Sequence, residues 1–125
     1  MSLALPRNTT HQAEGWLVGE IARVLNRMTG AVIVVFVLVH VVGQAALHAP
    51  ALAAMQPTAA TWLPVAQSHH WIHAILYFSL MFHTLHGLRL VVTELGARID
   101  YRASFWAILT VSTLVGLREV ARYVG

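Results

Sequence analysis

Two histidines and an arginine lie within a strongly apolar stretch of the chain, residues 81–96. His83 and His86 are three residues apart, and Arg89 follows three residues later. Ionisable side chains inside an apolar, membrane-spanning segment are costly to bury, so by default they indicate a functional site. A neutral imidazole ring is a common metal ligand, and a guanidinium group pairs with carboxylates and polarised oxygens. These residues could therefore bind a cofactor, or they could form hydrogen bonds between helices.

The helical neighbours of His83 are small. Ser79 and Gly87 lie four residues before and after it, and residues four apart share one face of a helix. Such a flat slot suits a porphyrin, which predicts that His83 is an axial ligand of a haem iron. Small residues also favour close helix packing, so a histidine hydrogen-bonded between helices is the alternative. Arg89 would bind a haem propionate or a quinone, unless it extends to the membrane surface. His86 would bind a propionate or a quinone, or it would itself be the iron ligand in place of His83.

A third histidine, His40, lies inside an earlier apolar segment and is followed by Gly43 and Gln44. It is either a second haem ligand or one partner of an interhelical hydrogen bond. His40 and His83 could also ligate one iron between them. Their separation along the membrane normal can be estimated by counting helical residues from flanking charged residues that are assumed to lie at the same depth. It is about 10 Å or about 3 Å, depending on which charged residue is used.

The remaining histidines lie outside these apolar segments. His69, His70 and His73 gather where the second apolar segment begins, and the first and last of them are four residues apart. A zinc site needs further ligands in tetrahedral geometry, and none is evident, so solvated side chains are expected. His11 and His48 are expected to be solvated as well.

Composition places the chain among integral membrane proteins. Of its 125 residues, 58% are hydrophobic and only 10% are charged, which is too little charge to cover a soluble domain. The absence of cysteine excludes disulfides, iron–sulfur ligation and thiolate catalysis by this chain. The basic residues are all arginines that flank apolar segments, which argues against nucleic acid as a partner. We expect no cleavable signal peptide, because the first twenty residues carry acidic side chains and lack an apolar core.

Hydrophobic stretches predict three transmembrane helices in one membrane-anchor domain, residues 1–125. The spans are expected at about residues 28–46, 71–92 and 104–120, with an amphipathic lead-in at about residues 16–27. An Ala- and Pro-rich loop is expected at about residues 47–67. Ser68 is predicted to cap the second span and Gly96 to end it.

The arginines are distributed unevenly about these spans. Only Arg118 and Arg122 lie on the side that carries the C-terminus, and the other arginines lie on or near the opposite side. The positive-inside rule therefore predicts a cytoplasmic N-terminus. Three spans cannot enclose much of a site, so partner helices are expected.

Two stretches resemble the cytochrome b subunit of succinate dehydrogenase (succinate:quinone oxidoreductase). One is Arg23-Val-Leu-Asn-Arg-Met-Thr-Gly30, which is similar to the family's S-x-x-H-R-x-[ST]-G entry to the first span. The other is His83-x-x-x-Gly87-Leu-Arg89 with Glu94-Leu-Gly96, which is similar to the family's H-x-x-x-G-[IL]-R-H-x-x-x-D-x-G. Their order and spacing match the family pattern. The chain departs from it at Arg23, Asn26, Leu90 and Glu94, where the family has serine, histidine, histidine and aspartate.

The resemblance implies an all-α fold with three transmembrane helices, half of a heterodimeric haem-binding anchor bundle. It places the haem b ligand at His83 and the quinone-binding arginine at Arg27, with Arg23 nearby. Family members with two haems carry a histidine about three turns after the Thr-Gly pair. By that pattern, His40 would bind a second haem. The other axial histidine of each haem would come from a second, homologous anchor subunit.

By the same resemblance, the chain would be a subunit of respiratory complex II in the cell inner (cytoplasmic) membrane. It would perform no bond chemistry itself. A flavoprotein subunit would oxidise succinate, and an iron–sulfur subunit would pass the electrons to membrane quinone. The alternatives are the anchor of a quinol:fumarate reductase, a haem-free structural anchor, and a small transporter or channel subunit.

Overall fold

The structure, a computed structural model, describes the backbone of residues 9–55 and 57–124. The described elements are the helices α1 (Thr9–His48), α2 (Pro50–Met55), α3 (Pro57–Gln67), α4 (His70–Glu94) and α5 (Tyr101–Val124). Three of them, α1, α4 and α5, are long and apolar enough to cross a membrane. The predicted all-α fold with three membrane spans is confirmed, and the chain is a multi-pass membrane protein.

The first membrane helix is longer than the predicted span. Residues 16–27 continue into it without a break, so the amphipathic lead-in is part of α1. Within that segment Val18 and Ala22 are buried. The lead-in therefore packs into the helix bundle instead of lying apart from it.

The segment between α1 and α4 is largely helical, and the loop prediction for residues 47–67 is wrong there. Helices α2 and α3 begin with Pro50 and Pro57. Proline suits the first turn of a helix, because the amide hydrogen that it lacks would have no intrahelical partner there. Alanine, the strongest helix former, is frequent after both prolines. Pro50 and Pro57 therefore start helices in this segment, whereas Pro64 lies inside α3.

Gly96 ends α4, as predicted. Its φ of +95° lies in the left-handed region, which glycine adopts at little cost. Its backbone N–H donates to the carbonyl of Thr93 at 3.0 Å, so one of the last carbonyls of the helix is satisfied.

Ser68 does not cap α4, and that prediction is wrong. The N-cap residue is His69, which makes no side-chain capping hydrogen bond. The Ser68 hydroxyl donates instead to the carbonyl of Val65, at 2.7 Å. Ser68 therefore completes the end of α3.

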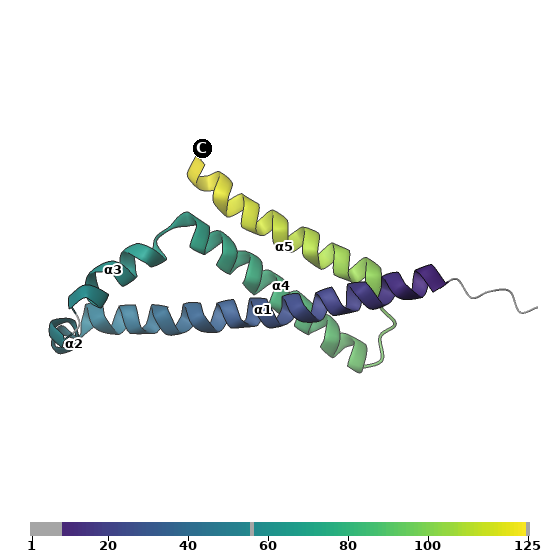
Figure 1. The fold of residues 1–125 in the computed structure, drawn as a ribbon, viewed down its shortest axis with the longest axis horizontal. Helices are drawn as coiled ribbons and strands as arrows, with labels where there is room; N and C mark the ends of the chain where they lie inside the picture. Colours follow the sequence, from purple (N-terminus) through teal and green to yellow (C-terminus); the bar gives the residue numbers. More distant parts are fainter. Residues whose placement is uncertain (1–8, 56, 125) are drawn as a thin grey trace, which may run out of the picture.

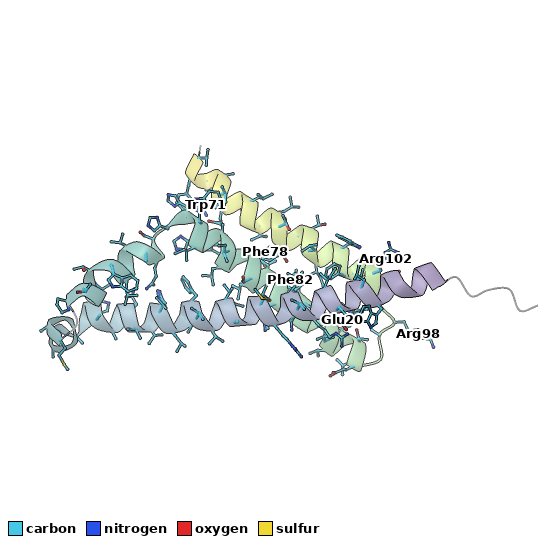
Figure 2. All side chains as sticks on the ribbon, in the orientation of Figure 1. Glu20, Trp71, Phe78, Phe82, Arg98 and Arg102 are labelled. Atoms are coloured by element: carbon cyan, nitrogen blue, oxygen red, sulfur yellow. The ribbon has the colours of Figure 1, made fainter. Side chains whose placement is uncertain are left out.

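Helices α4 and α5 run antiparallel as a hairpin, and α1 crosses α4 (Figure 1). The N-terminal part of α1 lies near the turn between α4 and α5. Its C-terminal part diverges from α4, and α2 and α3 return the chain across the gap. Figure 2 shows Glu20, Arg98 and Arg102 at the end of the bundle where that turn lies, and Trp71 toward the opposite end.

An apolar core forms where the three long helices meet. It consists of Val18 and Ala22 from α1, Phe82 from α4, and Phe105 and Ile108 from α5. Phe82 is completely buried, and its ring meets Phe105 edge to face with centroids 6.4 Å apart. Aromatic pairs favour that geometry. The core lies on the same part of α4 as His83 and His86, so it holds that part of the helix in place.

We predict that Phe82→Ala destabilises the bundle by about 3–5 kcal/mol, because it removes a fully buried ring and leaves a cavity. Thermal unfolding of the purified protein in detergent measures the effect. Leu114→Ala is the control, because Leu114 on α5 is 60% exposed and leaves no cavity when truncated. Equal losses in the two variants would contradict this account of the core.

Candidate functional site

His83 lies where α1 crosses α4. Its Nδ1 is 3.2 Å from the backbone carbonyl oxygen of Asn26. A carbonyl oxygen can only accept, so Nδ1 carries the ring proton and the lone pair lies on Nε2. Histidines that bind metals are commonly oriented in this way, by a hydrogen bond from the nitrogen that does not coordinate. The arrangement leaves a lone pair on Nε2 of His83 that can coordinate a metal.

Gly30 makes the close approach of His83 to α1 possible. A Cβ atom at this position would lie 3.1 Å from Cε1 and 3.4 Å from Nδ1 of His83. The two small neighbours on α4 differ from each other. Ser79 is buried, whereas a Cβ added at Gly87 would meet nothing within 4 Å. The predicted slot beside His83 is therefore open on the Gly87 side only.

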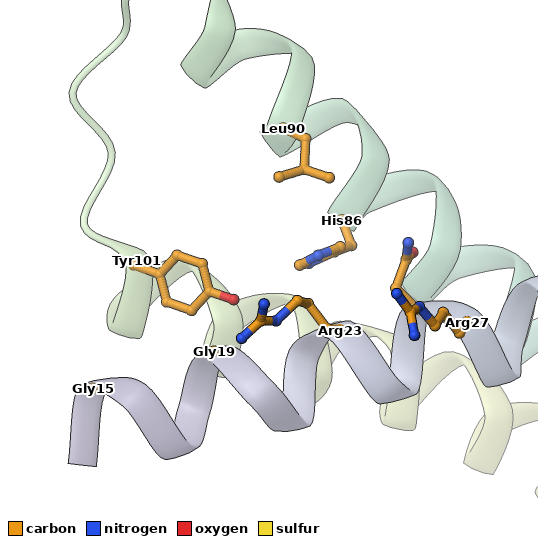
Figure 3. Close-up of a pocket in the computed structure, with 8 residues that line it drawn as sticks. Gly15, Gly19, Arg23, Arg27, His86, Leu90 and Tyr101 are labelled. Carbon is orange, nitrogen blue, oxygen red and sulfur yellow. The ribbon is translucent and has the colours of Figure 1, made fainter. Parts of the chain in front are cut away.

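A cleft of about 530 Å³ lies beside the crossing, between α1, α4 and α5. Its lining residues are Gly15, Gly19, Arg23, Asn26 and Arg27 of α1, His86 and Leu90 of α4, and Tyr101 of α5. The α1 residues recur every three to four positions, which places them on one face of the helix. Figure 3 shows Arg23, His86 and Tyr101 around a shared space. The fold thus brings together Arg23, Arg27 and His86, three of the predicted site residues.

The two arginines of the cleft differ in their partners. Arg23 forms an ion pair with Glu20 one turn away. Arg27 has no ion-pair or hydrogen-bond partner within residues 9–55 and 57–124. A guanidinium group presents several donors in one plane and binds carboxylates or polarised oxygens well. Of the two, Arg27 is the cation that is available to a ligand.

His86 and Arg89 are buried, and each has a polar atom without a protein partner. His86 is 3% exposed and stacks on Phe82 with ring centroids 5.7 Å apart, and its Nδ1 is unpaired. Arg89 is 8% exposed, so its side chain packs against protein. Its guanidinium carbon lies 3.9 Å from the centre of the Tyr101 ring, and one terminal nitrogen is unpaired. A buried unpaired polar group costs about 1–3 kcal/mol, which favours binding of a group that can pair with it.

His40 makes the interhelical hydrogen bond that one alternative predicted. Its Nδ1 lies 2.9 Å from Oε1 of Gln67 on α3. The ring is exposed and lies parallel to Phe36, with centroids 5.8 Å apart. The hydrogen bond engages one ring nitrogen and leaves Nε2 to coordinate a metal. Haem ligation by His40 therefore stays a prediction.

The contact between Gly30 and His83 determines the register of α1 against α4. His40 lies ten residues beyond Gly30, which is about 15 Å further along the helix. Two histidines that share one metal must both place a ring nitrogen about 2 Å from it. The alternative in which His40 and His83 of one chain ligate the same iron is therefore wrong.

The histidines at the start of α4 make different contacts. His69 and His70 are exposed, and His70 stacks on Tyr123 of α5 with ring centroids 3.5 Å apart. His73 is half-buried, and its Nδ1 has no partner. His48 is exposed as expected, and the side chain of His11 lies outside the described residues.

Sequence reasoning missed Tyr101, which both lines the cleft and stacks on Arg89. The turn after Gly96 brings the first residue of α5 back beside the last turns of α4, although twelve positions separate Tyr101 from Arg89. An aromatic residue beside charged residues at the end of a span is a typical membrane-interface signal. That signal predicts an interfacial tyrosine but not its partner.

We predict that Tyr101→Leu lowers the free energy of unfolding by about 0.5–2 kcal/mol, since it removes the ring that faces the Arg89 guanidinium. Tyr101→Phe keeps the ring and should retain most of that stability. Thermal unfolding in detergent compares both variants with the wild type. A loss in Tyr101→Phe as large as that in Tyr101→Leu would mean that the hydroxyl, not the ring, matters.

Comparison with known proteins finds no relative for this chain: no family model, curated protein or solved structure matches it. The functional assignment therefore depends on the residues themselves, their spacing and the geometry described above.

Proposed function

We propose that this chain is a haem b-binding membrane anchor subunit of a succinate:quinone oxidoreductase. In this role it carries electrons between an iron–sulfur subunit and membrane quinone, and it pairs with a second anchor subunit. A bound haem b supplies reversible one-electron storage without bond making. The chain lies in the cytoplasmic membrane with its N-terminus in the cytoplasm, so the cleft faces the side where soluble subunits would bind.

One observation carries the proposal: the way in which His83 is held. The Asn26 carbonyl keeps the proton on Nδ1, and Gly30 allows the ring to lie directly against α1. A histidine that served only as a hydrogen-bond donor between helices would need neither an open side nor a free Nε2. His83 has both, because no protein group within the described residues pairs with its Nε2 and the Gly87 side is open.

The residues present also fit a haem shared with another subunit. His83 can supply one axial nitrogen, and the second would come from the partner anchor, since His40 lies too far along α1. Two axial histidines leave no open coordination position, which suits electron transfer and disfavours oxygen chemistry. The unpaired nitrogens of His86 and Arg89 suit the carboxylates of haem propionates or the oxygens of a quinone.

The cleft supports the quinone part of the proposal. Arg27 is the unpaired cation there, and it can donate hydrogen bonds to a quinone oxygen as negative charge develops on it. Arg23 is partly neutralised by Glu20 and would contribute less. The apolar parts of the lining, which include Leu90 and the two glycines, leave room for a flat ring.

We expect His83→Ala to abolish binding of the haem that His83 ligates, because the axial nitrogen is lost. Gly30→Leu should also lower haem content, since its side chain must displace the His83 ring. Reduced-minus-oxidised absorption spectra of the purified complex, normalised to protein, measure haem content. Gly87→Ala is the matched control, because it adds a Cβ in open space on the neighbouring face.

Two results would argue against the proposal. An intact complex without b-type absorption would favour a purely structural anchor. A chain that purifies without flavin and iron–sulfur proteins would favour the transporter or channel alternative.

We also expect Arg27→Leu to lower quinone reduction about 10–100-fold, which corresponds to the loss of a hydrogen bond from a charged group. Succinate oxidation with a soluble dye acceptor should stay unchanged, since that reaction bypasses the membrane quinone. Arg98→Leu removes a charge from the turn outside the cleft and serves as the control. Equal losses in both variants would indicate a general effect of surface charge.

A further inference from the structure

Gln67, the last residue of α3, makes two hydrogen bonds to α1. Its Nε2 donates to the backbone carbonyl of Val39 at 3.2 Å. Its Oε1 lies 2.9 Å from Nδ1 of His40, the next residue of α1. Gln67 thus reaches from the connecting segment to the membrane helix at the position of the second intramembrane histidine.

These two hydrogen bonds determine the tautomer of His40. A backbone carbonyl only accepts, so the amide NH₂ of Gln67 must face Val39. The amide oxygen is then turned toward His40, and it too only accepts. Nδ1 of His40 must therefore carry the proton, which leaves the lone pair on Nε2.

Gly43 makes room for the Gln67 side chain. A Cβ atom at position 43 would lie 2.9 Å from Nε2 of Gln67, closer than real Cβ contacts occur. Gly43 is itself buried under α3, with Leu63 also nearby. A glycine one turn after His40 is therefore needed for Gln67 to reach α1 in this orientation.

The arrangement around His40 has the same parts as the one around His83. In each case a glycine on α1 allows a close approach, Gly43 or Gly30. In each case a carbonyl group accepts from Nδ1, either the Gln67 amide or the backbone of Asn26. Each arrangement leaves Nε2 as the free ring nitrogen. They differ in that the acceptor at His40 is a side chain, which can be exchanged by mutation.

We propose that Gln67 is a positioning residue that prepares His40 as an axial ligand of a second haem and tunes the electron density on its iron. The inference rests on the proposed function and extends it to α3. A hydrogen bond from Nδ1 makes the imidazole a stronger donor to a metal, which stabilises the oxidised iron and lowers the reduction potential. Loss of the Gln67 acceptor therefore raises the reduction potential of the haem, and a charged acceptor at position 67 lowers it.

The test uses the purified complex and three variants of this chain. His40→Ala identifies the haem that His40 ligates, as the one that is lost from absorption and low-temperature EPR spectra. Gln67→Leu removes the acceptor, and Gln67→Glu replaces it with a stronger one. Redox titration then gives the midpoint potential of each haem. Gln44→Leu is the control, because Gln44 is an exposed amide on α1 with no hydrogen-bond partner in the described residues.

We expect the potential of the His40 haem to rise in Gln67→Leu and to fall in Gln67→Glu, with a shift of its EPR g values. The His83 haem and the Gln44→Leu control should be unchanged. If Gln67 were only a structural link between α3 and α1, both Gln67 variants would lower the stability of the complex. They would not shift the midpoint potential of the His40 haem in opposite directions. That result would overturn the inference.

Failure of this inference is distinguishable from failure of the proposed function. A wild-type complex with one haem that survives in His40→Ala would overturn the role of Gln67 and leave the function at His83 intact. A wild-type complex with no haem would overturn both. One haem could depend on His40 while its midpoint potential and EPR spectrum stay unchanged in both Gln67 variants. That result would overturn only the positioning role of Gln67.

Discussion

The contact of His83 with α1 is the constraint on which the rest of the site depends. Gly30 lets the His83 ring lie close against the α1 backbone, because a Cβ atom there would lie only 3.1 Å from Cε1 of the ring and would push it away. The hydrogen bond to the Asn26 carbonyl then fixes both the ring and its tautomer. Because this contact sets the register of the two helices, it also places the α1 face of the cleft opposite His86 and sets His40 about 15 Å away along the helix.

A second property of the site is that several polar groups are buried without partners in this chain. The unpaired nitrogens of His86 and Arg89 lie beside the cleft that holds the available cation, Arg27. In an apolar membrane interior such groups are costly. These unpaired nitrogens are among the observations that support the proposed binding of a group with acceptor oxygens. Large apolar faces exposed on all three long helices suit lipid and a partner subunit on the remaining sides.

The connecting segment has a larger role than its composition indicates. Pro50 and Pro57 stand at helix starts, where the missing amide hydrogen costs nothing, and although Pro64 lies inside α3, a segment predicted as a loop forms two helices. The end of α3 then returns to α1 through Gln67, and Gly43 admits that side chain. The same segment thus closes the wide end of the bundle and bonds to one of its two intramembrane histidines.

The sequence alone determined the all-α class, the three membrane spans and the end of α4 at Gly96, because hydropathy and glycine conformation are local properties. It also singled out His83, His40, His86 and Arg89, because ionisable residues stand out in apolar segments, whereas Arg27 and Arg23 were singled out by the resemblance of their motif to the anchor family. Only the tertiary structure decided which of them meet. Register between helices depends on long-range packing, so the Gly30–His83 contact, the Tyr101–Arg89 stack and the Gln67–His40 bond have no local signal. Tertiary packing also buried Arg89 and placed the two candidate haem ligands, His83 and His40, far apart. Both outcomes depend on the position at which α1 crosses α4.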